Sequence, residues 1–189
     1  MIEDKQSAIR NRQSEMAMGK VWKYGDGVNT DVIFPGKYTY TLKAPKEIAA
    51  HALEDLDPNF AREAQAGDVI VAGRNWGNGS SREQAVTALK YKGVAAVVAK
   101  SFARIYFRNG INQGLLLITC PEAVDTAQTG DAIEIDLPRS IIRLNGREFA
   151  FAPLSPTALA MIEAGGLIPH LRKKLGLNST AEVPTGGGE

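Results

Sequence analysis

The sequence predicts a single α/β domain with a β-rich second half. Between residues 68 and 119, short continuous apolar runs alternate with helical segments. That arrangement is typical of a parallel sheet whose strands are covered on both faces. Beyond residue 131 the segments become short and β-like, and Asn145-Gly146 between two of them is a strong hairpin signal. A chain of 189 residues is long enough for one domain with a substantial core and too short for two large ones.

The parallel unit is predicted from apolar strands and the helices that separate them. Strands are expected over residues 19–24, 68–72, 94–99 and 115–119. Helices are expected over residues 45–56, 82–92 and 101–109. Gly93 directly follows the second of these helices, where a glycine commonly ends a helix.

The second half is predicted as strands followed by two helices. Short strands are expected over residues 131–136, 141–144 and 147–152, and helices over 155–164 and 167–175. Residues 1–18 form a polar lead-in without an apolar face. Residues 178–189 are rich in Gly, Thr and other small or polar residues, cannot bury a core and are expected to be disordered. The predicted domain therefore spans residues 19–177.

The composition excludes several classes of protein. Lys and Arg number 22 against 21 Asp and Glu, so no basic excess indicates nucleic-acid binding. The apolar stretches are too short to cross a membrane, and residues 1–18 lack the apolar core of a secretory signal. A cytoplasmic protein is expected. The single cysteine, Cys120, excludes an internal disulfide framework and a Cys-rich metal or iron–sulfur site held by this chain alone.

The loop of residues 73–83 carries the clearest chemical signal, because it follows an apolar strand and opens a helix. Its three glycines allow the backbone to approach a ligand closely, and the helix start offers unpaired N–H groups. Ser80 and Ser81 add hydroxyls, and Arg82 can hold a carboxylate with two parallel hydrogen bonds. The loop thus favours an anion. An ordinary strand-to-helix turn, with Ser81 as N-cap and Arg82 solvated, is an equally weighted alternative.

Other anion-binding and catalytic motifs do not fit this loop. A P-loop needs Gly-Lys before its Ser or Thr, but Gly79 is followed by Ser80. The dinucleotide fingerprint would need a third glycine where Arg82 stands, and the Gly-x-Ser-x-Gly elbow of serine hydrolases is absent. His51 and His170 lie in no recognisable catalytic triad and are expected to be structural or exposed.

The segment from Asn75 to Ala85 closely resembles the signature of the aconitase swivel domain, which also marks the small subunits of isopropylmalate dehydratase and homoaconitase. Residues 25–38, 101–116 and 165–171 resemble further family segments and stand in the family's order. The resemblance covers about residues 19–177. It implies a single swivelling β/β/α domain of the aconitase C-terminal type. It also implies a hydro-lyase that acts on a hydroxy di- or tricarboxylic acid.

The resemblance assigns roles to residues of the loop. It implies that Ser80 is the base that removes a proton from a substrate carbon, and that Arg82 holds a substrate carboxylate with help from Ser81. Asp31 matches a family acid that supports the active-site hydrogen bonds; the alternative for this residue is a turn or capping role. Asn75 and Gly79 are expected in the same supporting network.

The sequence departs from the family where the variable part of the substrate is selected. Thr39-Tyr40-Thr41 stands where many isopropylmalate dehydratases have an arginine, and Lys37 and Lys43 are the nearby cations expected to serve instead. The family loop often carries Cys or Glu at the position of Asn78. Interconversion of 3- and 2-isopropylmalate in leucine biosynthesis is the first expectation. Homoaconitate and 2,3-dimethylmalate are the alternative substrates.

The resemblance also implies a partner. Aconitase-type sites use a 4Fe-4S cluster held by three cysteines, and this chain has one cysteine, expected to be a buried structural thiol. The cluster is therefore expected on a larger second subunit, with no metal held by this chain. Two alternatives of other classes remain open. One is a non-catalytic anion-binding or assembly module, and the other is a self-contained enzyme acting on a phosphorylated substrate.

Overall fold

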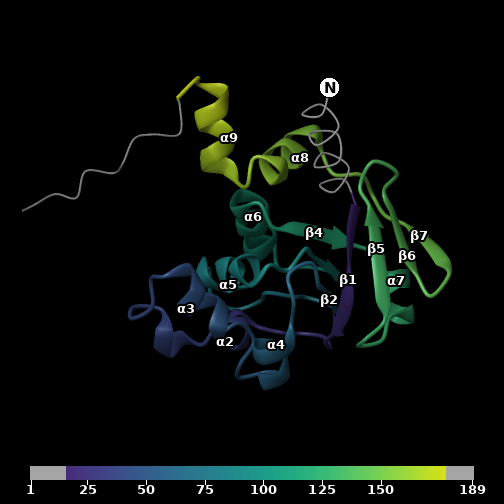
Figure 1. Ribbon diagram of the computed structural model, residues 1–189, viewed down its shortest axis with the longest axis horizontal. Coiled ribbons are helices and arrows are strands. Elements are labelled where there is room, and N and C mark those ends of the chain that lie inside the picture. Colours follow the sequence, from purple (N-terminus) through teal and green to yellow (C-terminus); the bar gives the residue numbers. More distant parts are fainter. Residues whose placement is uncertain (1–15, 178–189) are drawn as a thin grey trace, which may run out of the picture.

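The computed structural model describes residues 16–177, so the expectations for residues 1–15 and 178–189 lie outside the described residues. A seven-stranded sheet runs in the order β4-β3-β2-β1-β5-β6-β7 (Figure 1). Its strands are β1 (Met16–Lys23), β2 (Val69–Ala72), β3 (Ala96–Ala99), β4 (Leu116–Thr119), β5 (Ala132–Asp136), β6 (Ile141–Leu144) and β7 (Arg147–Ala150). The first four are mutually parallel and the last three antiparallel, which confirms the predicted division of the chain.

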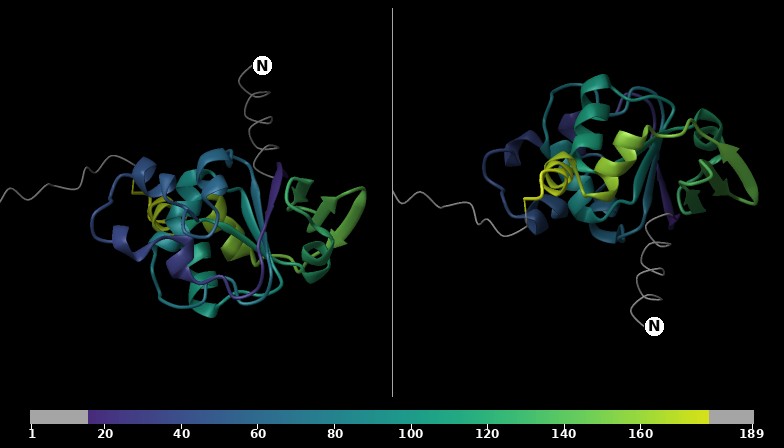
Figure 2. Two further views of the ribbon diagram at one scale, coloured as in Figure 1. Left: turned by 90° about the horizontal axis from the view of Figure 1, so that it is seen from below. Right: turned by 90° about the horizontal axis from the view of Figure 1, so that it is seen from above.

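Helices cover one face of the parallel strands. The helices are α2 (Thr30–Ile33), α3 (Pro45–Ala50), α4 (Pro58–Glu63), α5 (Gln84–Lys92), α6 (Arg104–Gln113), α7 (Pro121–Thr126), α8 (Pro156–Glu163) and α9 (Leu167–Lys174), and Gly36–Tyr38 form a 3₁₀ turn. Helices α2 to α6 lie on one side of the strands, whereas α7 and the ribbon β5-β6-β7 lie on the other (Figure 2). None of the helices between residues 16 and 177 is long and apolar enough to cross a membrane.

The parallel strands pack against a separate hydrophobic core on each of their two faces, which explains why their sequences are continuously apolar. In β2, Ile70 and Ala72 pack with the helices. Val69 and Val71 point the other way and pack with α7 and with the inner face of the ribbon. All four are buried, because successive residues of a strand point to opposite faces and both faces are covered here.

Strand β1 changes partner halfway along and so joins the parallel strands to the ribbon. Its first five residues pair antiparallel with β5, and its last three pair parallel with β2. At the changeover, the carboxylate of Asp68 accepts hydrogen bonds from Lys20 N at 3.1 Å and from Trp22 Nε1 at 2.8 Å. Gly19 stands there because a Cβ would lie 2.0 Å from the carbonyl oxygen of Gly67.

The first predicted helix is shorter than expected. It was predicted over residues 45–56 but ends at Ala50, and residues 51–56 form turns. The reason lies in tertiary contacts: the fully buried Leu53 adopts a left-handed conformation with φ 57°, and its N–H donates to Ile33 O at 2.9 Å. A helical Leu53 would lose that contact.

The structure corrects other boundaries too. Helix α5 begins at Gln84 instead of Arg82, and α6 spans 104–113 instead of 101–109. Strand β1 begins at Met16, three residues before the expected start. Helices α4 and α7 were missed, although each has a proline in its first turn, and Asp57 caps α4 through its side chain.

Candidate functional site

The loop of residues 73–83 lies where the carboxyl ends of β1, β2 and β3 meet. The loop follows β2, and the segments that follow β1 and β3 flank it on either side. Backbone hydrogen bonds join the loop to both neighbours: Gly77 N to Val28 O at 2.8 Å, Thr30 N to Asn78 O at 2.8 Å, Trp76 N to Ser101 O at 3.0 Å and Ala103 N to Trp76 O at 2.9 Å. Because the loop is held from two sides, its exposed tip is positioned by the backbone of the sheet.

The aromatic side chains packed under the loop, Trp76 and Tyr106, leave room only for a glycine at position 77. A Cβ on Gly77, whose φ is 75°, would lie 2.1 Å from the ring of Tyr106. The buried Trp76 packs edge-to-face on the same ring at 6.4 Å between centroids. Burial raises the pKa of Tyr106, so its hydroxyl stays protonated and donates to Ala85 O in α5 at 3.2 Å. The loop is thereby packed on α6 and coupled to the first turn of α5.

Ser80 is exposed at the tip of the loop, and its backbone and side chain both contact one buried residue. Ser80 N donates to Thr30 Oγ1 at 3.1 Å, and Ser80 Oγ lies 3.0 Å from the same oxygen. Thr30 is 1% exposed. The sequence did not single out Thr30, and its only signal was a place beside Asp31 within the family-like segment 25–38.

Arg82 and Asp31, two of the predicted site residues, are brought together by the fold. Arg82 Nη1 lies 2.7 Å from Asp31 Oδ1, and the arginine side chain is only 29% exposed. Asp31 is not the cap of α2, because the side chain of Asn29 accepts the N–H groups at the start of that helix. Gly36 permits the arrangement, since a Cβ there would lie 2.8 Å from Arg82 Nη1. The guanidinium is therefore held in place rather than solvated.

Three further predicted residues shape the loop around Ser80. Asn75 and Gly79 adopt left-handed conformations, with φ of 57° and 98°. Asn75 N donates to Ser101 Oγ at 2.9 Å, and its carbonyl accepts from Asn78 Nδ2 at 3.0 Å. Ser81 is exposed and does not cap α5, whose N-cap is Glu83 without a side-chain hydrogen bond. The hydroxyl of Ser81 thus has no hydrogen-bond partner among the described residues and is available to a ligand.

A pocket of about 630 Å³ opens beside Ser80. The loop supplies one wall and α6 the other; the lining residues are Asn75, Gly77, Gly79, Ser80, Ala103, Arg104, Ile105 and Arg108. Arg104 and Arg108 lie one helical turn apart, are exposed, and form no ion pair with any residue between 16 and 177. These arginines were not among the predicted site residues, although the sequence places them four residues apart on a predicted helix.

The two predicted lysines are not part of this pocket's lining. Lys37 Nζ lies 3.1 Å from Glu54 and 3.5 Å from Asp55, and the hydrogen bond to Glu54 raises the pKa of Lys37. Burial alone would raise the pKa of Glu54, but hydrogen bonds from His51, Lys37 and Tyr38 lower it below its usual range. Lys43 is exposed and contacts no acidic residue in the part of the chain that the structure describes.

An iron–sulfur cluster does not fit this chain. It needs three cysteine thiolates, and the only cysteine of the sequence is the buried Cys120. Burial raises the pKa of that thiol, whose Sγ lies 3.7 Å from Ala150 O beneath the ribbon. Among residues 16–177, no group of three or more His, Cys, Asp or Glu side chains could hold a metal ion.

Comparison with known proteins places this chain in a family. The family model for the aconitase C-terminal domain matches residues 23–123. The chain is 48% identical over 160 residues to the 3-isopropylmalate dehydratase small subunit of Hydrogenobaculum sp., covering 83% of this chain and 96% of that relative. The small subunit from Aquifex aeolicus is also 48% identical over 160 residues, with 83% and 95% covered.

A solved structure agrees with these relatives. The crystal structure of a 3-isopropylmalate dehydratase from Methanocaldococcus jannaschii matches with a TM-score of 0.81 and 43% sequence identity. The match covers 86% of this chain and 96% of that one. The predicted fold, a swivelling β/β/α domain of the aconitase C-terminal type, is confirmed. The chain belongs to the aconitase C-terminal domain family and, within it, to the 3-isopropylmalate dehydratase small subunits.

Proposed function

We propose that this chain is the small subunit of a two-subunit hydro-lyase that interconverts 3-isopropylmalate and 2-isopropylmalate in leucine biosynthesis. The observation that carries the proposal is the placement of Ser80. Its hydroxyl is exposed at a pocket, is held by the buried Thr30, and stands two residues from a guanidinium fixed by Asp31. The relatives that share this fold and most of this length are named for the same reaction.

Ser80 would act as the base. Its Oγ, as an alkoxide, takes the proton from the substrate carbon beside a carboxylate, the C–H electron pair forms the double bond, and the hydroxyl leaves from the neighbouring carbon. The hydroxyl leaves as hydroxide. In the reverse steps hydroxide adds to the carbon that lost its proton, and Ser80 returns that proton to the carbon that lost the hydroxyl, which restores the alkoxide and gives the isomer. A serine hydroxyl is a weak base, so its ionised form needs nearby positive charge and hydrogen-bond donors. Arg82 would supply the charge.

Arg82 would also hold a substrate carboxylate. Asp31 engages one guanidinium nitrogen at 2.7 Å and leaves the other donors free of partners among the described residues. The exposed hydroxyl of Ser81 would add a further donor. Of the two lysines, we rank Lys43 ahead of Lys37 as a substrate contact, because Lys37 would first have to leave Glu54 and Asp55.

The reaction would need a partner. A 4Fe-4S cluster supplies a Lewis acid for substrate oxygens when bound, and we place it on a large subunit because this chain has one cysteine. The pocket beside Ser80 is open, and its α6 wall carries the exposed Ile105 together with Arg104 and Arg108, which have no acidic partner between residues 16 and 177. We propose that the large subunit closes the pocket on this side and that the complex works in the cytoplasm.

The proposal is tested by reconstitution. The purified chain alone should be colourless and should not convert 3-isopropylmalate, whereas mixing with an iron–sulfur large subunit should give turnover. Hydration or dehydration by the pure chain without iron would overturn the two-subunit assignment. A large subunit whose activity is the same with and without this chain would instead favour the non-catalytic binding module.

The substrate assignment has its own test. Residues 39–43 follow closely on Gly36, where an added Cβ would lie 2.8 Å from Arg82 Nη1, and Tyr40 in this segment is 91% exposed. We propose that this segment contacts the variable substrate group and that 3-isopropylmalate is preferred over homoaconitate and 2,3-dimethylmalate. Replacing Thr39-Tyr40-Thr41 with the arginine-containing family version should change the ranking of kcat/KM values. An unchanged ranking would place specificity elsewhere.

A further inference from the structure

Thr30 makes an unusual pair of contacts with the proposed base. It is the first residue of α2 and is 1% exposed, yet its side chain faces an exposed serine fifty positions away. Thr30 Oγ1 accepts a hydrogen bond from Ser80 N at 3.1 Å and lies 3.0 Å from Ser80 Oγ. One buried hydroxyl therefore contacts both the backbone and the side chain of Ser80.

The position of this hydroxyl is tightly defined. Thr30 N donates to Asn78 O at 2.8 Å, so Thr30 holds the loop on both sides of Gly79. A Cβ on Gly79 would lie 3.3 Å from Thr30 Oγ1, and the φ of 98° at this residue favours glycine. A β-branched side chain has few χ1 positions to choose from, particularly at a helix start within a packed core. Thr30 Oγ1 is thus a fixed point beneath the tip of the loop.

Counting protons sets the direction of the hydrogen bond between the two hydroxyls. A hydroxyl has one proton and two lone pairs, and the N–H of Ser80 can only donate, so it occupies a lone pair of Thr30 Oγ1. If Ser80 Oγ also donated, the proton of the buried threonine would have no acceptor within the described residues, and an unmade buried hydrogen bond is costly. Thr30 therefore donates to Ser80 Oγ, which leaves the Ser80 proton facing the open pocket.

We infer that Thr30 is a positioning residue for the base: its buried hydroxyl donates a hydrogen bond to Ser80 Oγ and stabilises that oxygen after it loses its proton. This inference rests on the proposed function. A donor that is fixed before the reaction stabilises a developing negative charge without rearrangement. Hydrogen bonds to a charged oxygen are also stronger than those to a neutral hydroxyl, so Thr30 favours the ionised serine over the neutral one.

The experiment uses the complex of this chain with a large subunit, and compares Thr30→Val with Thr30→Ser. Valine keeps the shape of threonine but has no donor, so kcat should fall by about tenfold to a hundredfold, with KM little changed. The rising limb of the pH profile of kcat should move to higher pH, because the serine ionises less readily. Serine keeps the hydroxyl and should restore most of the turnover. Thermal unfolding of the isolated variants measures any effect on the fold.

A second pair of variants covers a failure of Thr30→Val to fold. Cysteine is close in size to serine but is a weak donor, so Thr30→Cys should lose turnover where Thr30→Ser keeps it. The role of Thr30 would be overturned if Thr30→Val or Thr30→Cys left kcat and its pH profile unchanged while Ser80→Ala was inactive. The proposed base would stand in that case. A kcat that falls without a pH shift would equally overturn it, as a structural effect. Full activity of Ser80→Ala would instead overturn the proposed base itself.

Discussion

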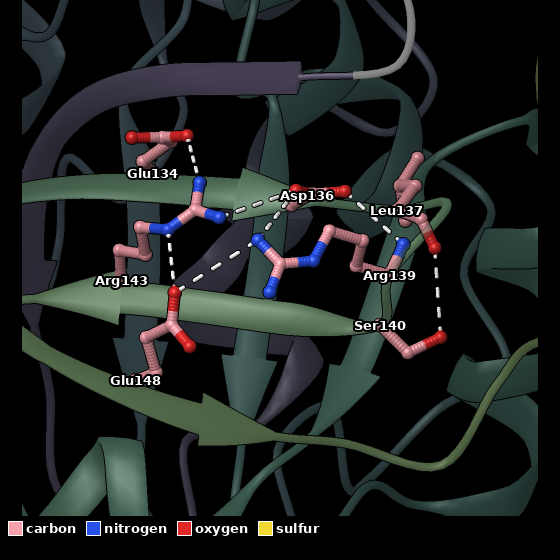
Figure 3. A network of polar contacts seen from close by, with 7 residues as sticks. All are labelled: Glu134, Asp136, Leu137, Arg139, Ser140, Arg143 and Glu148. Carbon is pink, nitrogen blue, oxygen red and sulfur yellow. Dashed lines mark hydrogen bonds and ion pairs between the residues drawn. The ribbon is translucent and has the colours of Figure 1, made fainter.

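The ribbon of β5, β6 and β7 and the loop beside the pocket both carry arginines, but these arginines differ in how fully they are paired. In the ribbon, Arg143 uses all three of its guanidinium nitrogens, on Glu134, Asp136 and Glu148 (Figure 3). Arg139 approaches two of the same carboxylates. In the loop, Arg82 has a single acidic partner within residues 16–177.

This difference separates stability from function. Three carboxylates already surround the guanidinium of Arg143, so the ribbon network holds neighbouring strands together and is poorly suited to accept a further carboxylate. An arginine that is fixed at one nitrogen and open at the others is prepared for a second carboxylate. The location agrees, because the open arginine lies at the carboxyl ends of parallel strands, where α/β folds commonly bind ligands. The paired arginines lie on the antiparallel ribbon, whose inner face covers the core.

The largest effect should come from the pocket side of this comparison. Ser80→Ala removes the proposed base, and turnover of the reconstituted complex should fall by about a thousandfold or more. The fold should be unaffected, because Ser80 is exposed and contributes nothing to either core. Steady-state kinetics of the complex and thermal unfolding of the isolated chain measure the two outcomes.

A matched serine in the ribbon serves as the control. Ser140 lies in the turn between β5 and β6, so Ser140→Ala should leave turnover unchanged. Near-normal activity of Ser80→Ala would remove this serine from the mechanism. A similar loss in both variants would mean that the assay responds to small disturbances of the fold.

Arg82 should show the next largest effect. Arg82→Lys keeps the charge but loses the planar fork, so it should lower kcat/KM by about tenfold or more, nearly as much as Arg82→Ala. The control is Arg139→Lys in the ribbon. The side chain of Arg139 approaches its two carboxylates only to 3.9 Å and 4.0 Å. That change should alter neither activity nor stability. If lysine restores full efficiency at position 82, the arginine acts only as a general positive charge.

The sequence predicted the strands of the sheet and identified the loop that carries most of the candidate site residues, because both signals are local. Continuous apolar runs such as 68–72 specify strands covered on both faces, and the loop motif carries Ser80 and Arg82 within three residues. The features that the sequence did not predict depend on contacts between segments that are distant along the chain. The early end of α3 follows from the N–H of Leu53 bonding Ile33 O, and Thr30 matters only because folding places it against Ser80.

At the junction of the parallel strands with the ribbon, Asp68→Asn should reduce stability without affecting turnover. The carboxylate of Asp68 accepts three N–H groups, from Lys20, Trp22 and Gln65, through two oxygens. An asparagine has one accepting oxygen, so in either orientation its NH₂ faces a donor. We expect a loss of about 2 kcal/mol in the free energy of unfolding. For a domain of this size that is a fall of about 4–8 °C in Tm.

The pH dependence of this effect has a defined sign. Burial alone would raise the pKa of Asp68, but the hydrogen bonds from Trp22 and from two backbone N–H groups lower it below its usual range. A carboxylate with a lowered pKa in the folded state stabilises above its unfolded pKa, and loses that contribution as pH falls through the folded pKa. The difference between the native protein and Asp68→Asn should therefore be constant near neutral pH and shrink below about pH 4. A difference that grows on acidification would contradict this account.

The smallest effect is expected on the ribbon itself, from Arg143→Met. The change leaves Glu134, Asp136 and Glu148 close together without their shared cation, so the ribbon should be weakened by repulsion among carboxylates. The contacts are partly exposed to water, which limits the loss to about 2 °C in Tm. The difference in Tm from the native protein should shrink in high salt, because ions screen exposed charges.

Turnover of the complex should be unchanged, since the network contacts neither the loop nor the pocket lining. A drop in turnover at full stability would show that the ribbon contributes to the site, and would end the separation between its paired arginines and the open arginine of the loop.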